Sequence, residues 1–329
     1  MQLLHSATRN YSWGSRTLIP HLQGQPDSDK PVAELWFGAH PGDPSTVDGR
    51  LLNEVIAEDP AGQLGSRVSA EYGERLPFLL KVLAAEEPLS LQAHPSKTQA
   101  EEGFARENAA GIELTASNRN YKDDNHKPEL IVALTDFYAM AGFRPLARTR
   151  ELFAALECPE LDHYVAMLDD DPSATTESAN LRVLFTTWIT IPSAKRKELI
   201  SAIVAAGERL IAADPADWKS RVMSTVLDLN QRYPGDIGVL GALLLNHIEL
   251  SPGEAVYLDA GQLHAYVSGL GVEIMANSDN VLRGGLTPKF VDVPELVKVL
   301  TYAAADEPRV QQQDKSAQDN VHDLSLIHI

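Results

Sequence analysis

Three separated segments of the chain carry imidazole, carboxylate and amide groups at spacings that could hold a metal ion. In the first segment, 89–95, Ser90, Gln92 and His94 alternate with apolar residues. Strand side chains alternate in direction, so these three polar groups would share one face of a strand. A strand with a solvent-facing polar side gives the same pattern, so this segment alone does not establish a site.

The second segment is a polar cluster at 121–129 that ends in Glu129, immediately before an apolar run at 130–134. Pro128 biases Lys127 toward an extended conformation, which would place Glu129 at the mouth of a strand. The alternative reading is an exposed acidic turn.

The third segment, 261–289, places His264, Tyr266 and Ser268 on one face of a predicted strand. The charged residues that follow them are Glu273, Asp279, Arg283 and Lys289. A single strand histidine is usually structural, but here it has several ionisable neighbours. The three segments could bring nitrogen and oxygen ligands to one ion, which suits zinc and, less exclusively, manganese, cobalt or iron. Spacing alone does not show that they converge.

Short apolar runs punctuated by glycine, proline and aspartate fill the chain up to about residue 144. They predict short strands of a sandwich or barrel at 32–38, 78–82 and 130–134. Helical stretches are expected between them, at 51–59 and 97–109.

From 145 to 247 the apolar residues recur at helical spacing. Stripes at 199–211 and 218–229 each mark one face of a helix, with Ser193 as a possible N-cap of the first. A third helix is predicted at 237–248. This block therefore predicts an all-helical segment.

Short apolar runs typical of strands return at residue 249. A strand at 255–258, a turn and a strand at 263–267 are predicted, with another strand at 272–276. The simplest account is one catalytic β-domain, formed by 1–144 and 249–305, that carries a helical insertion domain at 145–248.

The tail, 306–329, is polar and aperiodic until an apolar hexad at its end. It predicts a linker or the stub of a further β-domain. The hexad is either one last strand or a sign that the natural chain is longer.

The overall composition limits the possible partners. The 329 residues carry a net charge of −18, which repels nucleic acid and anionic lipid, so neither is expected. A phosphate site would need a few local cations. The single cysteine, Cys158, excludes a disulfide framework and suits the cytoplasm. No apolar stretch approaches the roughly 20 residues of a membrane span.

At these segments the sequence closely resembles type I mannose-6-phosphate isomerase (phosphomannose isomerase), a family of zinc enzymes in the cupin superfamily. The resemblance rests on 92–95, 121–129 and 264–289, and 10–14 and 33–38 also look like family segments. It covers roughly 1–310. It implies a mainly β fold with an α insertion, in which a cupin (jelly-roll) β-barrel and an all-helical domain precede a truncated C-terminal β-domain.

The resemblance implies a monomeric cytoplasmic isomerase that interconverts mannose 6-phosphate and fructose 6-phosphate through an enediol(ate), with one zinc ion per subunit. Carried over residue by residue, the family's zinc ligands fall on Gln92, His94, Glu129 and His264.

Other family roles fall on charged residues near these ligands. The active-site arginine falls on Arg283, and a candidate proton-transfer carboxylate falls on Glu273, with His126 or a metal-bound hydroxide as the alternative base. The remaining residues assigned to the pocket are the catalytic candidate Lys127 and the substrate-binding candidates Ser90, Lys289, Lys81 and Trp13.

Two rival functions remain open on the sequence. A non-catalytic metal-binding cupin that binds sugar phosphate would use the same ligands without needing both Arg283 and Glu273. A metal-dependent oxygenase on the same barrel would favour iron.

Overall fold

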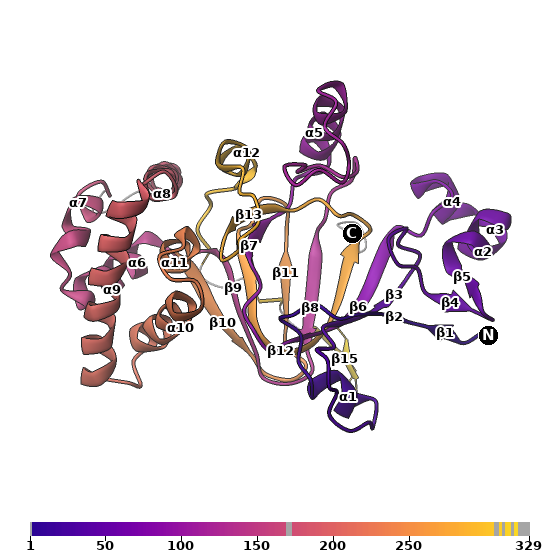
Figure 1. The fold of residues 1–329 in the computed structure, drawn as a ribbon, viewed down its shortest axis with the longest axis horizontal. Helices are drawn as coiled ribbons and strands as arrows, with labels where there is room; N and C mark the ends of the chain where they lie inside the picture. The colour runs from indigo at the N-terminus through magenta and orange to yellow at the C-terminus, as the bar shows by residue number, and fades with distance from the viewer. Residues whose placement is uncertain (1, 169–172, 306–308, 311–312, 317–318, 322–329) are drawn as a thin grey trace.

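The computed structural model describes residues 2–168, 173–305, 309–310, 313–316 and 319–321. Antiparallel strands form the centre of the molecule (Figure 1). One group of helices gathers beside one edge of the strands, and a smaller N-terminal group lies at the opposite end. The predicted mixture of sheet and helix is therefore confirmed.

The helices lie in three parts of the chain. Those before the helical block are α1 (Leu18–Leu22), α2 (Leu52–Glu58), α3 (Pro60–Leu64), α4 (Ser66–Tyr72) and α5 (Lys97–Ala109). The block itself contains α6 (Leu146–Leu156), the 3-10 turn η1 (Pro159–Leu161), α7 (Asp162–Val165), α8 (Ala174–Ile189), α9 (Ser193–Ala213), α10 (Trp218–Arg232) and α11 (Ile237–Ala242). One later helix, α12 (Val293–Val299), follows the last strand of the central sheets.

The strands alternate with these helices. Before the helical block they are β1 (Leu4–His5), β2 (Ala7–Arg9), β3 (Glu34–Phe37), β4 (Thr46–Val47), β5 (Arg50–Leu51), β6 (Phe78–Ala85), β7 (Leu91–Ala93), β8 (Glu129–Ala133) and β9 (Phe137–Phe143). After it they are β10 (Leu245–Leu250), β11 (Ala255–Leu258), β12 (His264–Ala276), β13 (Leu282–Gly285), β14 (Gln313–Ser316) and β15 (Asp319–Val321).

The long strand β12 belongs to two sets of paired strands. Its first half pairs with β9 and β7, and its second half pairs with β6 and β8. Gly269 stands between the halves with φ +123°, and a Cβ there would lie 2.7 Å from the carbonyl oxygen of Asp136. Only glycine fits this backbone and this close approach. One strand can therefore serve both sets of pairs.

Register places the functional side chains in two rows across neighbouring strands. In one row His264 of β12 lies opposite Gln92 of β7, which lies opposite Arg283 of β13. In the other row Glu273 of β12 lies opposite Lys81 of β6. Because directly paired residues point to the same face, each row presents its side chains together.

The helical block shares a hydrophobic core with the strands. Phe143 of β9 stacks on Tyr302 at 5.5 Å between ring centroids and meets Phe185 of α8 edge-on at 5.7 Å. Trp188 of α8 and Leu91 of β7 belong to the same buried cluster. The position of the helices relative to the strands is thus set by apolar packing.

Three local expectations were wrong. Ser193 is the first residue of α9 and Pro192 precedes it as the cap, without a side-chain hydrogen bond. The helix predicted at 237–248 ends at Ala242, and Leu245–Leu250 is a strand that pairs with β9. The apolar run at 238–245 continues from α11 into Leu245, so the sequence pattern does not mark where the helix ends and the strand begins.

The third error concerns strand connections. The predicted strands at 263–267 and 272–276 are one strand, β12, and β11 pairs with β8 instead of forming a hairpin with 263–267. The tail contains a hairpin of β14 and β15 within the expected linker. The apolar hexad at 324–329 lies outside the described residues. Within the described ranges, no helix is both long and apolar enough to cross a membrane.

Candidate metal centre and substrate cavity

Glu129, the first residue of β8, lies between two histidines. Its Oε1 is 3.2 Å from His94 Nε2, and its Oε2 is 3.4 Å from His264 Nε2. All three residues are buried, and each offers a ligand atom within 4.8 Å of the others. Segments that are distant in sequence thus meet at one point.

Backbone carbonyls fix the orientation of both imidazole rings. His94 Nδ1 lies 2.7 Å from the carbonyl oxygen of Asn280, and His264 Nδ1 lies 2.9 Å from that of Gln262. A ring that donates from Nδ1 keeps a lone pair on Nε2, which here faces Glu129. Burial, followed by the charge of Lys127, lowers the pKa of His94 to about 4, so this ring is neutral near pH 7.

The geometry fits a divalent cation. His94 Nε2, His264 Nε2 and Glu129 Oε2 are buried without a hydrogen-bond partner in the described part of the chain. Such unpaired buried atoms are costly, which indicates a missing ligand. Two imidazole nitrogens and a carboxylate oxygen suit zinc. Gln92, opposite His264 in register, could add an amide oxygen.

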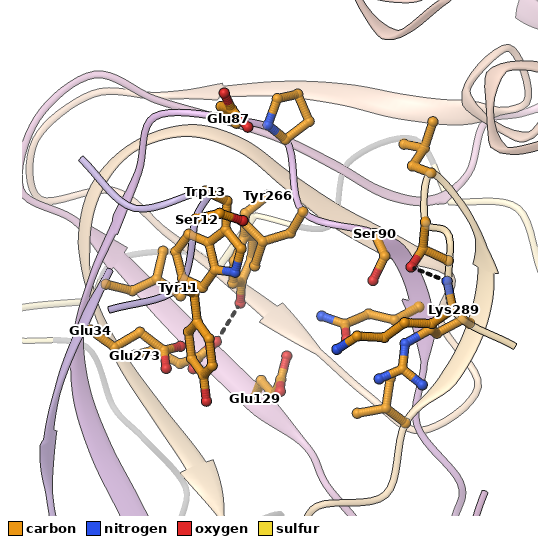
Figure 2. Close-up of a pocket in the computed structure, with 18 of the residues that line it drawn as sticks. Tyr11, Ser12, Trp13, Glu34, Glu87, Ser90, Glu129, Tyr266, Glu273 and Lys289 are labelled. Carbon is orange, nitrogen blue, oxygen red and sulfur yellow. Dashed lines mark hydrogen bonds between the residues drawn. The ribbon is translucent and has the colours of Figure 1, made fainter. Parts of the chain in front are cut away.

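These ligands adjoin a cavity of about 500 Å³. In Figure 2, Glu34, Glu273 and Tyr266 lie on one side of the cavity and Ser90 and Lys289 on the other, with Glu129 between them. The cavity therefore has two chemically different walls with the metal-binding residues in the middle.

One wall is a buried chain of alternating acids and hydrogen-bond donors. Glu273 accepts a hydrogen bond from the Tyr266 hydroxyl at 2.9 Å and pairs with Lys81 Nζ at 3.1 Å. Lys81 also pairs with Glu34 at 3.4 Å, and Glu34 accepts from Trp36 Nε1 at 2.8 Å.

The charged groups in this wall shift one another's pKa. Burial raises the pKa of Glu273, although Lys81 opposes the shift. Burial alone would lower the pKa of Lys81, but Glu34 and Glu273 raise it above its ordinary value. Lys81 therefore stays charged, while Glu273 is a carboxylate that can accept a proton more readily than an exposed one.

The opposite wall carries cations. In the described ranges, Arg283, Lys289 and Lys122 make no ion pair with a carboxylate within 4.0 Å. Burial lowers the pKa of Arg283, and burial followed by Arg283 and Lys122 lowers that of Lys289. Unpaired cations gathered in a chain of net charge −18 form a local anion site.

The structure brings the residues selected from the sequence to this one cavity. The lining includes Trp13, Lys81, Ser90, Gln92, Lys127, Glu129, Glu273, Arg283 and Lys289. His94 and His264 adjoin it through Glu129, and Lys127 Nζ lies 2.8 Å from Glu129 Oε1. The alternative base His126 does not line the cavity.

Sequence reasoning missed several lining residues. Among those given no role are Tyr11, Glu34, Trp36, Lys122 and Tyr233. Glu34 had a usable signal, because a carboxylate inside an apolar strand run is rarely buried without a role. Tyr233 had none, since it follows a helix 100 positions or more from the first two ligand segments and reaches the cavity only through tertiary packing.

Comparison with known proteins identifies the family of this chain. The family model for the catalytic domain of type I phosphomannose isomerase matches residues 1–146. The mannose-6-phosphate isomerase of Escherichia coli (strain K12) is 41% identical over 312 residues, which cover 92% of this chain and 75% of that protein. The chain belongs to the type I phosphomannose isomerase family. The resemblance inferred from the motifs is confirmed.

Other phosphomannose isomerases extend the comparison. The human mannose-6-phosphate isomerase is 36% identical over 340 residues, covering 96% of this chain and 77% of that protein. A crystal structure of the Salmonella typhimurium enzyme bound to fructose 6-phosphate and zinc superposes with a TM-score of 0.83 at 38% identity, covering 96% of this chain and 78% of that one. A zinc-bound structure of mannose 6-phosphate isomerase has a TM-score of 0.83 at 37% identity, covering 96% and 79% of the two chains.

Proposed function

We propose that this chain interconverts D-mannose 6-phosphate and D-fructose 6-phosphate with one zinc ion held by Gln92, His94, Glu129 and His264. The observation that carries the proposal is a cavity in which unpaired ligand atoms lie between a cationic wall and a buried acidic wall. The related enzymes named above act on this sugar phosphate, and one is bound to fructose 6-phosphate and zinc.

The reaction moves a proton between C2 and C1 of the sugar while the carbonyl moves the other way. Glu273 is the proposed base, because burial raises its pKa and Tyr266 and Lys81 hold both of its oxygens in place. A bound zinc ion would supply Lewis-acid polarisation of the substrate oxygens. Lys127 keeps Glu129 ionised and stands where it can bind a substrate oxygen.

The cationic wall accounts for the other half of the substrate. Lys289 and Ser90 would hold the phosphate, and Arg283 would bind phosphate or stabilise negative charge that develops on the sugar oxygens. Trp13, which stacks on Tyr11 at 5.6 Å between ring centroids, offers an apolar surface for the sugar. Binding energy from the phosphate positions the reacting carbons.

The finer features of the fold are also proposals. We assign the antiparallel strands to a cupin (jelly-roll) domain made of 1–144 and 249–305, with 145–248 as a helical insertion and 306–329 as a linker or the stub of a C-terminal β-domain. A monomeric state is proposed from the family resemblance alone. The free, buried Cys158 suits the cytoplasm.

The rival functions have less support. A non-catalytic cupin would not need the buried Glu273 and the unpaired Arg283 on opposite walls of one cavity. An oxygenase would favour iron over zinc. The relatives above are isomerases, and the structures named above hold zinc.

The experiment is metal removal followed by a coupled assay on mannose 6-phosphate. Chelation should lower the isomerase rate by about 100-fold or more, and zinc should restore it, because the ion stabilises charge that forms during the proton transfer. Metal content per chain and circular dichroism are measured alongside. His264→Ala serves as the matched variant and should lose bound metal while keeping its helical spectrum.

Two results would contradict the proposal. A full rate in metal-free protein would exclude metal-assisted isomerisation. Stoichiometric iron with no isomerase activity would favour the oxygenase.

A further inference from the structure

The cavity loop, residues 286–289, forms part of the cationic wall. All four of its residues line the cavity, and it ends in Lys289. In Figure 2 Lys289 lies on the same side of the cavity as Ser90, across from Tyr266 and Glu273. The position of Lys289 therefore depends on how this loop leaves β13.

The loop begins with an unusual backbone. Gly285 has φ +130° and Leu286, a non-glycine residue, has φ +55°. A left-handed conformation is unfavourable for leucine and needs support from its surroundings. Leu286 is 1% exposed and belongs to the core shared with the helical block, so its side chain is fixed by packing.

The backbone of this turn is held by a residue of the helical block. Asp236 Oδ1 accepts a hydrogen bond from Leu286 N at 2.6 Å and another from Gly238 N at 2.7 Å. The second bond caps α11, and the first reaches 50 positions along the chain. In Figure 1 α11 lies on the side of the helical block that faces the strands.

Close packing leaves little freedom at this contact. A Cβ on Gly285 would lie 2.4 Å from Gly238 N, and a Cβ on Gly238 would lie 2.7 Å from Leu286 N. The far end of the segment is held separately, because Asp292 Oδ2 accepts a hydrogen bond from Asn120 at 2.8 Å. Asp236 thus holds the backbone at the start of the cavity loop, while core packing holds the Leu286 side chain.

We propose that Asp236 is a positioning residue for phosphate binding, because the oxygen that caps α11 also holds Leu286 in the conformation that directs Lys289 into the cavity. Through Asp236 the helical block then influences substrate binding indirectly, because Asp236 itself does not contact the substrate. The inference rests on the proposed isomerase function for its substrate, but the contact can also be tested with inorganic phosphate alone.

The test compares Asp236→Ala with Asp236→Asn in the zinc-loaded protein. Asp236→Ala removes the acceptor, so the KM for mannose 6-phosphate and the inhibition constant of inorganic phosphate should both rise about tenfold, with a smaller fall in kcat because the phosphate also positions the reacting carbons. Asp236→Asn keeps an acceptor oxygen and should stay within about twofold of the wild type. Calorimetric titration with inorganic phosphate gives the same comparison without turnover.

Asp217→Ala is the matched control. Asp217 caps α10 by accepting a hydrogen bond from Lys219 N at 2.8 Å, and it does not line the cavity. Its loss should lower the unfolding free energy as a lost cap does, without changing KM. The double variant of Asp236→Ala and Lys289→Ala should have the same KM as Lys289→Ala alone, because Asp236 acts through that lysine.

The outcomes separate this inference from the proposed function. Unchanged phosphate affinity in Asp236→Ala, an equal KM change in Asp217→Ala, or additive effects with Lys289→Ala would each overturn the positioning role. A wild-type protein without isomerase activity would overturn the proposed function, and phosphate titration would still decide the role of Asp236.

Discussion

At the scale of single residues, the site depends on buried charges that compensate one another. Burial opposes ionisation of Glu129, yet the charge of Lys127 holds its pKa well below its usual range. In the acidic wall, ion pairs likewise join Lys81 to Glu34 and to Glu273. In contrast, Arg283 has no carboxylate within ion-pair distance in the described ranges, so its charge is available to an anion.

Arg283→Ala tests whether that free charge serves the reaction. Because a preorganised cation stabilises charge that develops during proton transfer, we expect kcat/KM to fall by about 100-fold or more with zinc content unchanged. Arg221→Ala is the control, since Arg221 is an exposed residue of α10 that donates to the carbonyl oxygen of Ala216. A wild-type rate in Arg283→Ala would remove Arg283 from the mechanism.

At the scale of elements, the junction between α11 and β10 joins the helical block to the strands. His247 of β10 contacts the carbonyl oxygen of Ala242, the last residue of α11, through Nε2 at 2.9 Å. Burial lowers the pKa of His247 to about 4, although the bond to Ala242 opposes the shift. The histidine is therefore neutral in the folded protein under conditions where it is protonated in the unfolded chain.

This difference predicts a pH-dependent stability. Between about pH 6.5 and pH 4 the unfolded chain binds a proton at His247 that the folded protein does not, so the unfolding free energy falls by roughly 1 kcal/mol per pH unit as the pH falls. Above this window both states are neutral and the contribution vanishes. His247→Gln should make urea unfolding less sensitive to pH between 6.5 and 5, and an identical pH dependence would contradict the prediction.

At the scale of the whole molecule, the helical block and the strands form one hydrophobic core. Phe143 of β9 touches both Phe185 of α8 and Tyr302. Tyr233, which follows α10, lines the same cavity as residues of the strands. A shared core and a shared cavity imply that the two parts unfold together.

Phe143→Ala tests this coupling. The substitution removes a ring that is 1% exposed, so we expect a loss of about 3–5 kcal/mol in unfolding free energy with a single transition retained. Urea unfolding is followed by far-ultraviolet circular dichroism and by tryptophan fluorescence, which should give coincident curves. Val183→Ala, at a side chain of α8 that is 51% exposed, should change stability by less than about 0.5 kcal/mol. Two separate transitions would show that the helical block unfolds independently.

The sequence by itself determined the local elements and the chemistry. The apolar period at 199–211 predicted α9, and alternation at 89–95 predicted β7, although this strand spans only Leu91–Ala93 and leaves Ser90 outside it. Family motifs selected His94, Glu129 and His264 before any contact among them was visible. These features can be recognised from the sequence because periodicity and residue type are local properties.

The tertiary structure alone decided which distant residues meet. His94 is oriented by Asn280, 186 positions away, and Asp236 holds Leu286 across 50 positions. The start of β10 is predicted as helix because the apolar run at 238–245 crosses from α11 into Leu245, and only the pairing of β10 with β9 marks where the strand begins. Such contacts depend on how β12 pairs with both sets of strands and on how the helices pack against them. The free energy that selects those pairings comes from long-range burial and hydrogen bonding, which no single stretch of sequence encodes.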